Sequence, residues 1–442
     1  MRSDLQRKGD ALMSKLYGNT GARAHAAGGA SASAAHRQTR RPRGILRRLG
    51  TAALVLGLLY GFVVWAPVKP VRRLRDMYIE TALSTMSHKW LATRFFPASI
   101  VEQVRQDMLA AQESQQGLTS DWGDEEALNL VIPESQEAAS PDATNDPAME
   151  AFFALFWELD REETLDWLRS EPALLENGWA HLSANSAGPK DPGLPVHTVM
   201  GEQVLAIDAY QQVLLVRVKG SGYRGVLAVA KDPARLSLQA SASIGESGQP
   251  AGVIAEAHDG LLAMTASGFW DDDGHGSGGA VTGYALCRGK EYGRPFGTAG
   301  YKRFERRDDG LLYIMDSSSP LAASATDAME FTPALIVDGE ITVDDSCGWT
   351  ATNPRACLGQ SRRHEILMLV IEGRLPTVSI GTDVMECADI LSLHDCMQAM
   401  NMDGGTSAML YYDGAYVTLC SNTALPAGRR LPNAWVYGRR SD

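Results

Sequence analysis

The chain has 442 residues, more than one typical domain, which predicts two or three segments. Its 43 glycines and 7% aromatic residues indicate a loop-rich α/β or α+β protein and argue against a helical bundle. The formal net charge of -12 argues against nucleic acid as a partner of the main body.

The N-terminal end separates a basic stretch from an apolar one. Residues 1–48 carry eleven Lys or Arg without apolar periodicity, which predicts a disordered basic tail. Residues 49–66 carry no charge and predict a transmembrane helix with Trp65 as an interfacial anchor. A signal peptide and a buried core helix are the alternatives, but no Ala-x-Ala-like site precedes Pro67, and core helices usually keep a polar face.

The distribution of basic residues predicts an orientation for this span. More Lys and Arg precede the span than follow it, so we expect a cytoplasmic N-terminus and an extracellular C-terminal domain in the cell membrane. The tail arginines would then lie on the lipid surface rather than bind nucleic acid.

The next segments alternate between helical and polar composition. Residues 71–106 show helical spacing broken at Pro97, which predicts a juxtamembrane helical pair within residues 67–113. Residues 114–148 are rich in Gln, Ser, Glu, Asp and Pro and predict an acidic linker that is solvated at least in part. Residues 149–182 return to helix, with a Phe/Trp stripe that is typical of core packing.

Beyond Pro195 short apolar runs alternate with turn residues, which is typical of strands. The predicted strands are 203–210, 212–218, 225–230, 261–266, 283–287, 311–315, 334–337, 354–359 and 365–371. A short helix is expected from 254 to about Gly260, and a longer one from 382 to 400.

Two features bear on metals and redox chemistry. The loop 267–279 offers Asp271, Asp272 and Asp273 to a metal, but it lacks the distal Glu of an EF-hand, which favours a hydrated loop. All six cysteines lie in the last third without a Cys-x-x-Cys pair, which argues against a zinc site. Disulfides and buried free thiols both remain open.

The stretch from Ala399 to Tyr412 organises the predicted domain. It is expected to form a strand, a turn with a carboxylate at Asp403, and a second strand. Gly404 and Gly405 let a ligand approach bare amides, and Thr406 and Ser407 add two hydroxyls, a combination that suits a sugar phosphate. An ordinary hairpin is the alternative, because Asp-Gly is also a strong turn signal.

Six motifs occur in a specific order along the second half of the chain. They are Ser-Gly-Phe-Trp-Asp (267–271), Pro-Arg-Ala-Cys-Leu-Gly-Gln (354–360), Val-Ile-Glu-Gly-Arg (370–374), Glu386 with Ala388 in a helix, Asn-Met-Asp-Gly-Gly-Thr-Ser (401–407) and Arg-Arg-Leu-Pro-Asn-Ala (429–434). Together they resemble the phosphodiester glycosidase family over about residues 195–438. The membrane-anchored layout resembles the family's bacterial, exopolysaccharide-associated members.

The resemblance assigns site residues position by position. It places the family's signature turn on Asp403, Gly404, Gly405 and Ser407, an Arg-x-x-x-Gly element on Arg355 and Gly359, an acidic-Gly-Arg element on Glu372, Gly373 and Arg374, and a glycine loop on Gly268 and Phe269. Two positions depart from the family pattern. Thr265 stands where the family usually has Asn, and Glu372 where it usually has Asp.

The expected chemistry is cleavage of a sugar–O–phosphate bond. Arg355 and the turn amides would stabilise the phosphate, and carboxylates would stabilise an oxocarbenium-like state or activate water. The predicted catalytic residues are Asp403, then Glu372 and Asp271, and the predicted substrate-binding residues are Arg355, Gly404, Gly405, Thr406, Ser407, Gly268, Thr265, Arg374 and Arg430. For each acid a turn cap or surface charge is the alternative, and for Arg374 and Arg430 a structural ion pair.

These observations combine into one expectation. The fold class is α+β, with a mixed-sheet phosphodiester glycosidase-like domain preceded by a transmembrane helix and juxtamembrane helices. The expected segments are 1–48, 49–66, 67–113, 114–148, 149–194 and 195–442. The expected function is hydrolysis of a GlcNAc-1-phosphate-type diester in surface polysaccharide, without a cofactor, although a divalent cation stays open. The alternative is a non-catalytic binding or assembly factor of the same fold.

Overall fold

The computed structural model describes residues 43–85, 88–123, 146–271 and 276–441. The chain divides into two units, Met1–Leu59 and Tyr60–Asp442. Most of the predicted basic tail and acidic linker, and the acids Asp272 and Asp273, lie outside the described residues.

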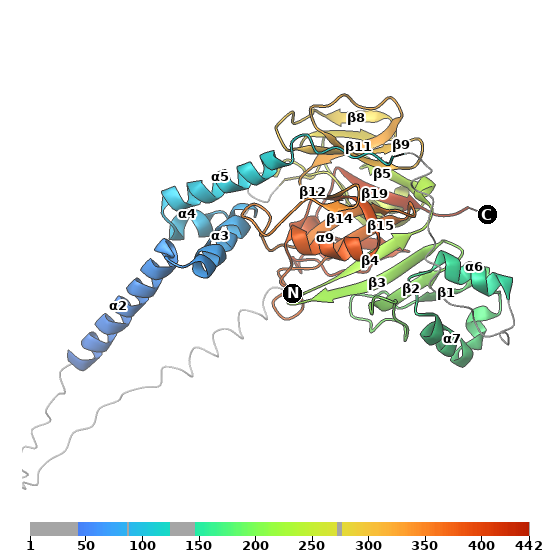
Figure 1. The fold of residues 1–442 in the computed structure, drawn as a ribbon, viewed down its shortest axis with the longest axis horizontal. Coiled ribbons are helices and arrows are strands. Elements are labelled where there is room, and N and C mark those ends of the chain that lie inside the picture. Colours follow the sequence, from blue (N-terminus) through green and yellow to red (C-terminus); the bar gives the residue numbers. More distant parts are fainter. Residues whose placement is uncertain (1–42, 86–87, 124–145, 272–275, 442) are drawn as a thin grey trace, which may run out of the picture. The chain divides into compact units, whose positions relative to one another are not determined.

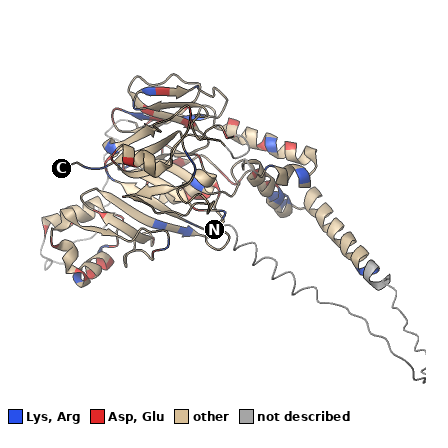
Figure 2. Ribbon diagram, turned by 180° about the vertical axis from the view of Figure 1, so that it is seen from behind, with Lys and Arg blue, Asp and Glu red and all other residues tan. Residues whose placement is uncertain are grey.

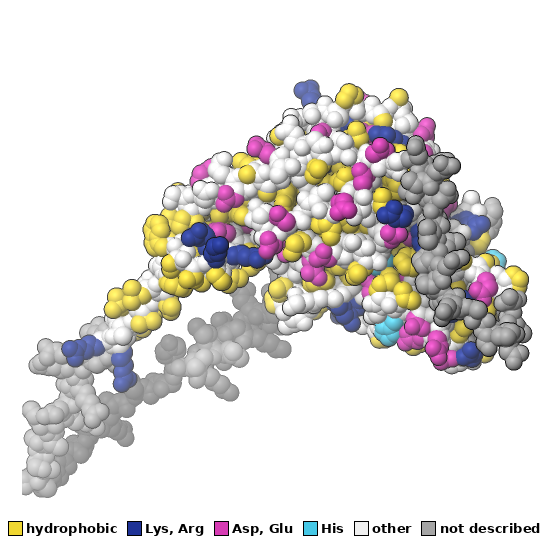
Figure 3. Space-filling view, in the orientation of Figure 1, with side chains coloured by type: hydrophobic (Ala, Val, Ile, Leu, Met, Phe, Trp, Pro, Cys, Tyr) yellow, Lys and Arg dark blue, Asp and Glu magenta, His cyan; other side chains and the backbone are white. Residues whose placement is uncertain are grey.

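The apolar N-terminal segment forms one helix, α2 (Arg43–Trp65). Its stretch Arg47–Trp65 is long and apolar enough to cross a membrane. Figure 2 shows α2 tan over most of its length, and Figure 3 shows apolar side chains exposed along it. By length and composition, α2 is therefore consistent with a single-pass anchor or with a signal sequence.

Three short helices follow, where the sequence predicted a pair: α3 (Lys69–Leu83), α4 (Trp90–Phe95) and α5 (Ala98–Ser114). The apolar spacing of this stretch did not indicate that α3 and α4 are separate helices. Pro97 immediately precedes α5, a position where its missing N–H costs no hydrogen bond.

The start of the predicted linker, which was expected to be solvated at least in part, anchors buried side chains against the sheets between exposed residues. Gln115 is buried, and its side-chain amide exchanges two hydrogen bonds with the backbone of Ala334, at 2.8 and 3.0 Å. The buried Trp122 donates its indole N–H to the Leu312 carbonyl at 2.9 Å. Residues 115–123 thus belong to the folded domain, because these polar groups find partners there.

The described strands form three sheets (Figure 1). The nine-stranded sheet has the order β1 (Ser183–Asn185), β2 (Gln203–Asp208), β3 (Val213–Gly220), β4 (Tyr223–Ala230), β15 (Ile366–Ile371), β14 (Arg355–Ser361), β16 (Cys396–Asn401), β12 (Ala334–Val337) and β13 (Glu340–Ile341). One five-stranded sheet has the order β10 (Leu312–Asp316), β9 (Lys302–Arg307), β11 (Ala325–Phe331), β7 (Tyr284–Cys287) and β8 (Lys290–Gly293). The other has the order β18 (Ala415–Tyr416), β17 (Leu410–Tyr412), β6 (Gly260–Thr265), β19 (Asn433–Gly438) and β5 (Leu236–Ala240).

The pairing corrects the expected sheet type. Each pair of neighbouring strands in the described sheets is antiparallel, so the expectation of a mixed sheet was wrong. Apolar runs and turn residues do not show whether neighbouring strands are parallel or antiparallel, because that depends on which strands pair in the fold. The α+β class itself is confirmed.

The nine-stranded sheet is buried on both faces, which explains its nearly continuous apolar strands. In β3, Val213 and Leu215 enter one core cluster, whereas Leu214 and Val216 enter another. The first cluster also contains residues of both five-stranded sheets, such as Met264 and Phe304, and therefore lies between the sheets. Alternation with period two assigns successive side chains to the two cores.

Helices cover the other faces. The second core cluster receives side chains from α6 (Pro147–Leu155), α7 (Arg161–Ser170) and α9 (Val384–Leu393). The short helix α8 (Ala251–Ala257) covers the outer face of β6 and β19. The described residues also form short 3-10 helices, η1 (Pro172–Leu175), η2 (Trp179–His181), η3 (Pro233–Arg235) and η5 (Gly405–Ser407). The predicted Phe/Trp stripe is buried in the second cluster, as expected.

The long helix expected from 382 to 400 was wrong in its second half. It begins as predicted, with the Asp383 side chain accepting from the Glu386 amide, but it ends at Leu393. Residues Cys396–Asn401 form β16, which is buried along its whole length between β14 and β12. A short apolar run can pack as a helix or as a strand, and here the tertiary context decides.

Candidate functional site

The turn that carries Asp403 joins two different sheets. It begins after β16 in the nine-stranded sheet and ends at β17 in a five-stranded sheet, and these strands do not pair with each other, so the hairpin alternative was wrong. The Asp403 amide donates to the Ala266 carbonyl at 3.1 Å, and the Gly405 amide donates to the Pro354 carbonyl at 3.0 Å. The turn is therefore fixed from both sheets.

Glycine is required at both turn positions by close neighbours. A Cβ on Gly404 would lie 2.8 Å from the Pro354 carbonyl oxygen. Gly405 has a φ of 62°, and a Cβ there would lie 3.3 Å from Nη1 of Arg374. The two glycines thus bring Arg374 against the turn that carries Asp403.

Asp403 has an unusual acidity for an aspartate. Burial, with a smaller contribution from the negative Asp271, raises the pKa of its carboxyl to about 6. The Ser407 hydroxyl, the Arg429 guanidinium and the Gly404 amide act in the opposite direction. A carboxyl with such a pKa is mostly ionised at neutral pH and still basic enough to accept a proton, which suits a general base.

Arg429 links Asp271 to the region of Asp403. Its guanidinium donates to both carboxylate oxygens of Asp271 at 2.9 Å, and it lies 5.0 Å from the centre of the Phe269 ring. Asp271 also accepts from the Gly276 amide at 2.6 Å. This bidentate pair raises the pKa of Arg429, so the arginine stays charged beside Asp403. With both oxygens bound in this way, Asp271 is placed to orient Arg429.

Arg374 and Arg355 occupy the opposite side of the turn. Arg374 donates to the Asn353 side-chain oxygen at 2.8 Å, and Arg355 donates to the carbonyls of Thr382, at 3.2 Å, and Ala351. Although Arg374 keeps solvent exposure, burial of its guanidinium and repulsion from Arg355 lower its pKa, while attraction to Asp403 raises it. The structure therefore places the guanidinium of Arg374 against the Asp403 turn and that of Arg355 near Arg374, while a role of the two in binding phosphate stays a prediction.

Glu372 is held in a structural position. Its buried carboxylate accepts from Nε of Arg224 at 2.7 Å and from the Leu419 amide at 2.9 Å. Arg224 lies in β4 and Leu419 follows β18, so Glu372 ties the end of β15 to two other segments. We assign Glu372 to positioning, because both of its oxygens serve contacts within the protein.

The remaining predicted residues surround the same turn. Thr265, at the end of β6, is completely buried, and its hydroxyl has no hydrogen-bond partner. The Thr406 hydroxyl accepts from Ser421 at 3.1 Å. Gly268 packs so tightly that a Cβ would lie 2.7 Å from the Thr282 hydroxyl. Each of these positions is spatially constrained.

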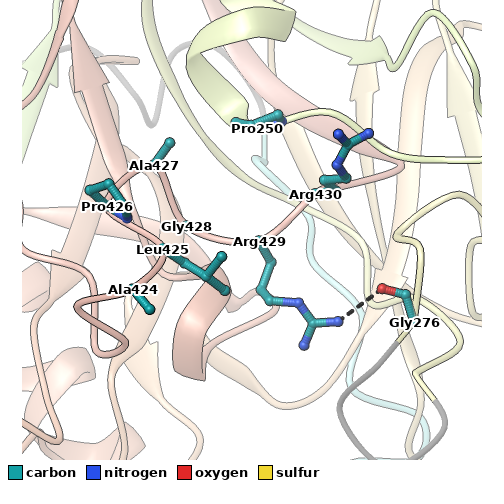
Figure 4. A pocket seen from close by; sticks show the side chains of 9 residues that line it. All are labelled: Pro250, Gly276, Ala424, Leu425, Pro426, Ala427, Gly428, Arg429 and Arg430. Atoms are coloured by element: carbon teal, nitrogen blue, oxygen red, sulfur yellow. Dashed lines mark hydrogen bonds between the residues drawn. The ribbon is translucent and has the colours of Figure 1, made fainter. Parts of the chain in front are cut away.

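A cavity of about 350 Å³ opens beside Arg429. Its lining consists of Pro250, Gly276, Ala424, Leu425, Pro426, Ala427, Gly428, Arg429 and Arg430. Figure 4 shows Arg429 directed toward the Gly276 carbonyl and Arg430 directed toward Pro250. The predicted residue Arg430 thus lines the cavity, while its neighbour Arg429 makes the contact with Asp271.

The described residues contain no group of three or more His, Cys, Asp or Glu side chains that could hold a metal ion. All six cysteines are free, and five of them are buried. Of the two alternatives for the cysteines, the structure has free thiols.

The comparison with known families decides the assignment of the region. Residues 259–437 match the phosphodiester glycosidase family. The resemblance seen in the six motifs is thereby confirmed, and all six lie within the matched range, although this range starts later than the expected 195. The match covers less than half of the chain, so α3, α5 and the strands β1 to β5 lie outside this phosphodiester glycosidase region.

Solved structures show distant similarity. One is the catalytic domain of zebrafish N-acetylglucosamine-1-phosphodiester alpha-N-acetylglucosaminidase, auto-inhibited by its pro-peptide, with 17% identity and a TM-score of 0.43 over 60% of this chain and 90% of that one. Another is a hypothetical protein from Synechocystis, with 12% identity and a TM-score of 0.39 over 53% of this chain and 63% of that one. Comparison with curated protein sequences gave no significant match.

Sequence reasoning missed four residues of this site. Arg429 lay inside a quoted motif, but the sequence does not show which of two adjacent arginines turns inward. Asn353 and Arg224 contact predicted residues from outside the motifs. Glu80 lies far from the motifs in the sequence, and no local pattern could have joined it to the phosphodiester glycosidase region.

Proposed function

We propose that the protein hydrolyses a sugar-1-phosphodiester of the GlcNAc-1-phosphate type, in cell-surface polysaccharide. The observation that carries this proposal is the carboxyl of Asp403, whose pKa burial raises to about 6, in a turn that Arg374 contacts and close enough to Arg429 for that guanidinium to act on it. The match of residues 259–437 to the phosphodiester glycosidase family supports the same reaction class.

The proposed chemistry divides between the two sides of the turn. Asp403 takes a proton from a water molecule as that water attacks the anomeric carbon. The sugar–oxygen bond breaks, and the oxygen leaves with its electron pair on a phosphate monoester. Since a phosphate monoester holds its last proton with a pKa of about 6, it leaves far more readily than an alkoxide and needs positive charge more than a general acid.

Arg374 and Arg355 supply that positive charge in the proposal. Guanidinium groups match the geometry of phosphate oxygens, and because the diester already carries a negative charge they bind it in the substrate as well as in the transition state. The turn amides are already bound within the protein, since the Gly405 amide donates to the Pro354 carbonyl at 3.0 Å and the Gly404 amide to the Asp403 carboxyl. Gly404 and Gly405 therefore serve the close approach of Pro354 and Arg374 to the turn, where a Cβ would obstruct it.

Release of sugar tests this function directly. The full chain in detergent is incubated with a synthetic GlcNAc-1-phosphodiester, and free GlcNAc is measured against time. We expect multiple turnovers, without added metal, that rise with enzyme concentration. Absence of release at high enzyme concentration, from a protein that melts cooperatively, would contradict a hydrolytic function for this diester.

A non-catalytic binding or assembly factor is the second candidate, and Thr265 is the observation that favours it. Its hydroxyl is buried without a hydrogen-bond partner at a position where the family usually has an amide. A protein that binds the diester measurably by calorimetry, but releases no sugar, would be such a factor.

We also propose that α2 anchors the protein in the cell membrane, with the N-terminus cytoplasmic and the C-terminal domain outside. Support comes from the apolar stretch Arg47–Trp65 and the basic residues before it. External protease on intact cells should digest a tag placed after Asp442 and spare a tag placed before Arg40. The reverse pattern would contradict the orientation, and loss of the N-terminal tag from mature protein would indicate a cleaved signal sequence.

A further inference from the structure

One face of α3 contacts the segment 350–353, which leads into β14. The Thr81 hydroxyl accepts from the Thr352 amide at 3.1 Å, and the Ser84 hydroxyl accepts from the Asn353 side chain at 3.0 Å. These contacts join residues about 270 positions apart in the sequence. Because α3 lies outside the range 259–437, the family match gives it no role.

Glu80 is the central contact of this face. Its side chain is completely buried, and its carboxylate accepts from the Thr350 hydroxyl at 2.7 Å and from the Ala351 amide at 3.0 Å. Both donors are neutral. Among the described residues Glu80 forms no salt bridge that would compensate the burial of its carboxylate. Burial of a carboxylate is costly unless hydrogen bonds compensate it, and here they fix the Thr350 side chain and the Ala351 backbone.

The segment that Glu80 fixes also holds both arginines of the candidate site. The Ala351 carbonyl accepts from Arg355, and the Asn353 side-chain oxygen accepts from Arg374 at 2.8 Å. Arg374 additionally lies 3.5 Å from the Thr85 hydroxyl, at the end of α3. The amide that Glu80 binds and the carbonyl that binds Arg355 belong to the same residue, Ala351, so movement of that residue displaces the arginine.

We infer that α3 forms part of the phosphate side of the candidate site, and that Glu80 is a positioning residue that holds Arg355 and Arg374 toward the Asp403 turn through segment 350–353. This inference rests on the proposed function, since it assigns the two arginines to the phosphate of a sugar phosphodiester. It extends the site beyond the phosphodiester glycosidase region to the helix that follows the candidate membrane segment.

The kinetic consequence is specific. A guanidinium that binds the phosphate contacts it in the bound substrate as well as in the transition state, so misplacing the arginines raises KM more than it lowers kcat. A purely structural role for Glu80 would instead reduce the amount of folded protein and leave KM unchanged.

Three substitutions in the full chain separate these cases. Glu80→Ala removes both hydrogen bonds to segment 350–353. Glu80→Gln keeps them, because its oxygen accepts from the Ala351 amide and its amide group donates to the Thr350 hydroxyl, which accepts as well as donates. Ile79→Ala is the matched control, since Ile79 is equally buried but packs against Val101 and Val104 instead of segment 350–353.

Steady-state kinetics on the synthetic GlcNAc-1-phosphodiester give the measurement. We expect Glu80→Ala to raise KM about tenfold with kcat changed less than about threefold, and Glu80→Gln to return KM to near the parent value. Ile79→Ala should lower the melting temperature at an unchanged KM. Equal KM values for Glu80→Ala and Ile79→Ala would overturn the inference.

Calorimetric measurement of binding of the same diester distinguishes failure of the proposed hydrolysis from failure of the positioning role of Glu80. If the parent binds the diester without releasing sugar, and Glu80→Ala weakens that binding about tenfold, hydrolysis is wrong and the positioning role stands. If the parent binds and Glu80→Ala binds equally well, the positioning role is wrong whatever the catalytic result. A parent that neither binds nor hydrolyses the diester overturns both.

Discussion

Among the clusters of buried charge in the described part of the chain, those around Lys231 and around Asp403 differ in what their atoms contact. Around Lys231, the ammonium group binds Glu158 and Glu365, the latter at 2.8 Å, while Ser361 and Trp157 donate to Glu365 at 2.9 and 3.1 Å. Around Asp403, the charged groups approach one another at a turn that joins two sheets, and a cavity opens beside Arg429. The Lys231 side chain is 3% exposed, and the Glu158 side chain is completely buried.

Both clusters contain a carboxyl with a raised pKa. Burial raises the pKa of Glu158 against the attraction of Lys231, and burial raises the pKa of Asp403 against Ser407 and Arg429. A perturbed pKa alone therefore does not distinguish a structural cluster from a candidate catalytic one. Access for a ligand and the backbone conformation of the turn make the difference.

The largest effect should follow from breaking the enclosed cluster. Lys231→Ala leaves two carboxylates without their cation, which should lower the free energy of unfolding by about 3–5 kcal/mol. Chemical denaturation measures the loss. The combined change Lys231→Met, Glu158→Gln and Glu365→Gln is the control, and it should recover most of the stability. The fraction of Lys231→Ala that stays folded should keep the parent kcat, and a lower kcat per folded molecule would contradict a purely structural cluster.

The next effect concerns Asp403. Asp403→Asn keeps the shape and removes the base, so kcat should fall by a factor on the order of 10² or more. The melting temperature at neutral pH should not fall, because the raised pKa of the carboxyl means that its ionised form is stabilised less by the folded protein than by water. Asp413→Asn, at an exposed position, should leave kcat unchanged. Full activity of Asp403→Asn would direct the search for the base to Glu372 or Asp271.

A smaller effect should appear in the pH profile of Arg429→Gln. Because Arg429 lowers the pKa of Asp403, its loss should move that pKa above about 6. A base works in its ionised form, so kcat/KM of the parent should rise with pH through about pH 6, and the rise in Arg429→Gln should occur at higher pH. Rate measurements from pH 4.5 to 8.5 give both midpoints. A midpoint that stays in place would show that Asp403 is not the group that titrates.

The smallest effect is expected at Thr265. Thr265→Asn restores the amide usual in the family and should raise turnover severalfold if the site is weakened but intact, since an amide offers both a donor and an acceptor. Thr265→Val is the matched control, and it should leave turnover unchanged because the hydroxyl has no partner. A fall in turnover in Thr265→Asn would mean that the pocket is built around the smaller side chain.

The sequence predicted about half of the described strands of the phosphodiester glycosidase region, where alternation and turn residues give local signals. It failed where tertiary context decides: the apolar run after Leu393 became β16, and β9 (Lys302–Arg307), rich in charge, was not expected to be a strand. In β9, Arg303 and Glu305 are buried as an ion pair, a contact that no periodicity indicates. For the candidate site, the motifs predicted Asp403 and its glycines, but they could not predict which distant groups approach them. Glu80 and Arg224 lie outside the motifs in the sequence, and they approach the candidate site only in the folded protein.

The Asp403 turn passes from one sheet to another, and this limits how the length of the turn can vary among related proteins. Asn401 is in register with Cys357 on one side, and Leu410 with Met264 on the other, so an inserted or deleted residue between them would shift one of the two registers. Loops on the surface tolerate insertions at a cost of only about 0.6 kcal/mol for each doubling in length. Segment 424–430, which lines the cavity, has this freedom on its exposed side. New substrate preferences should therefore arise by changes in the length of that segment, while the length of the Asp403 turn stays constant.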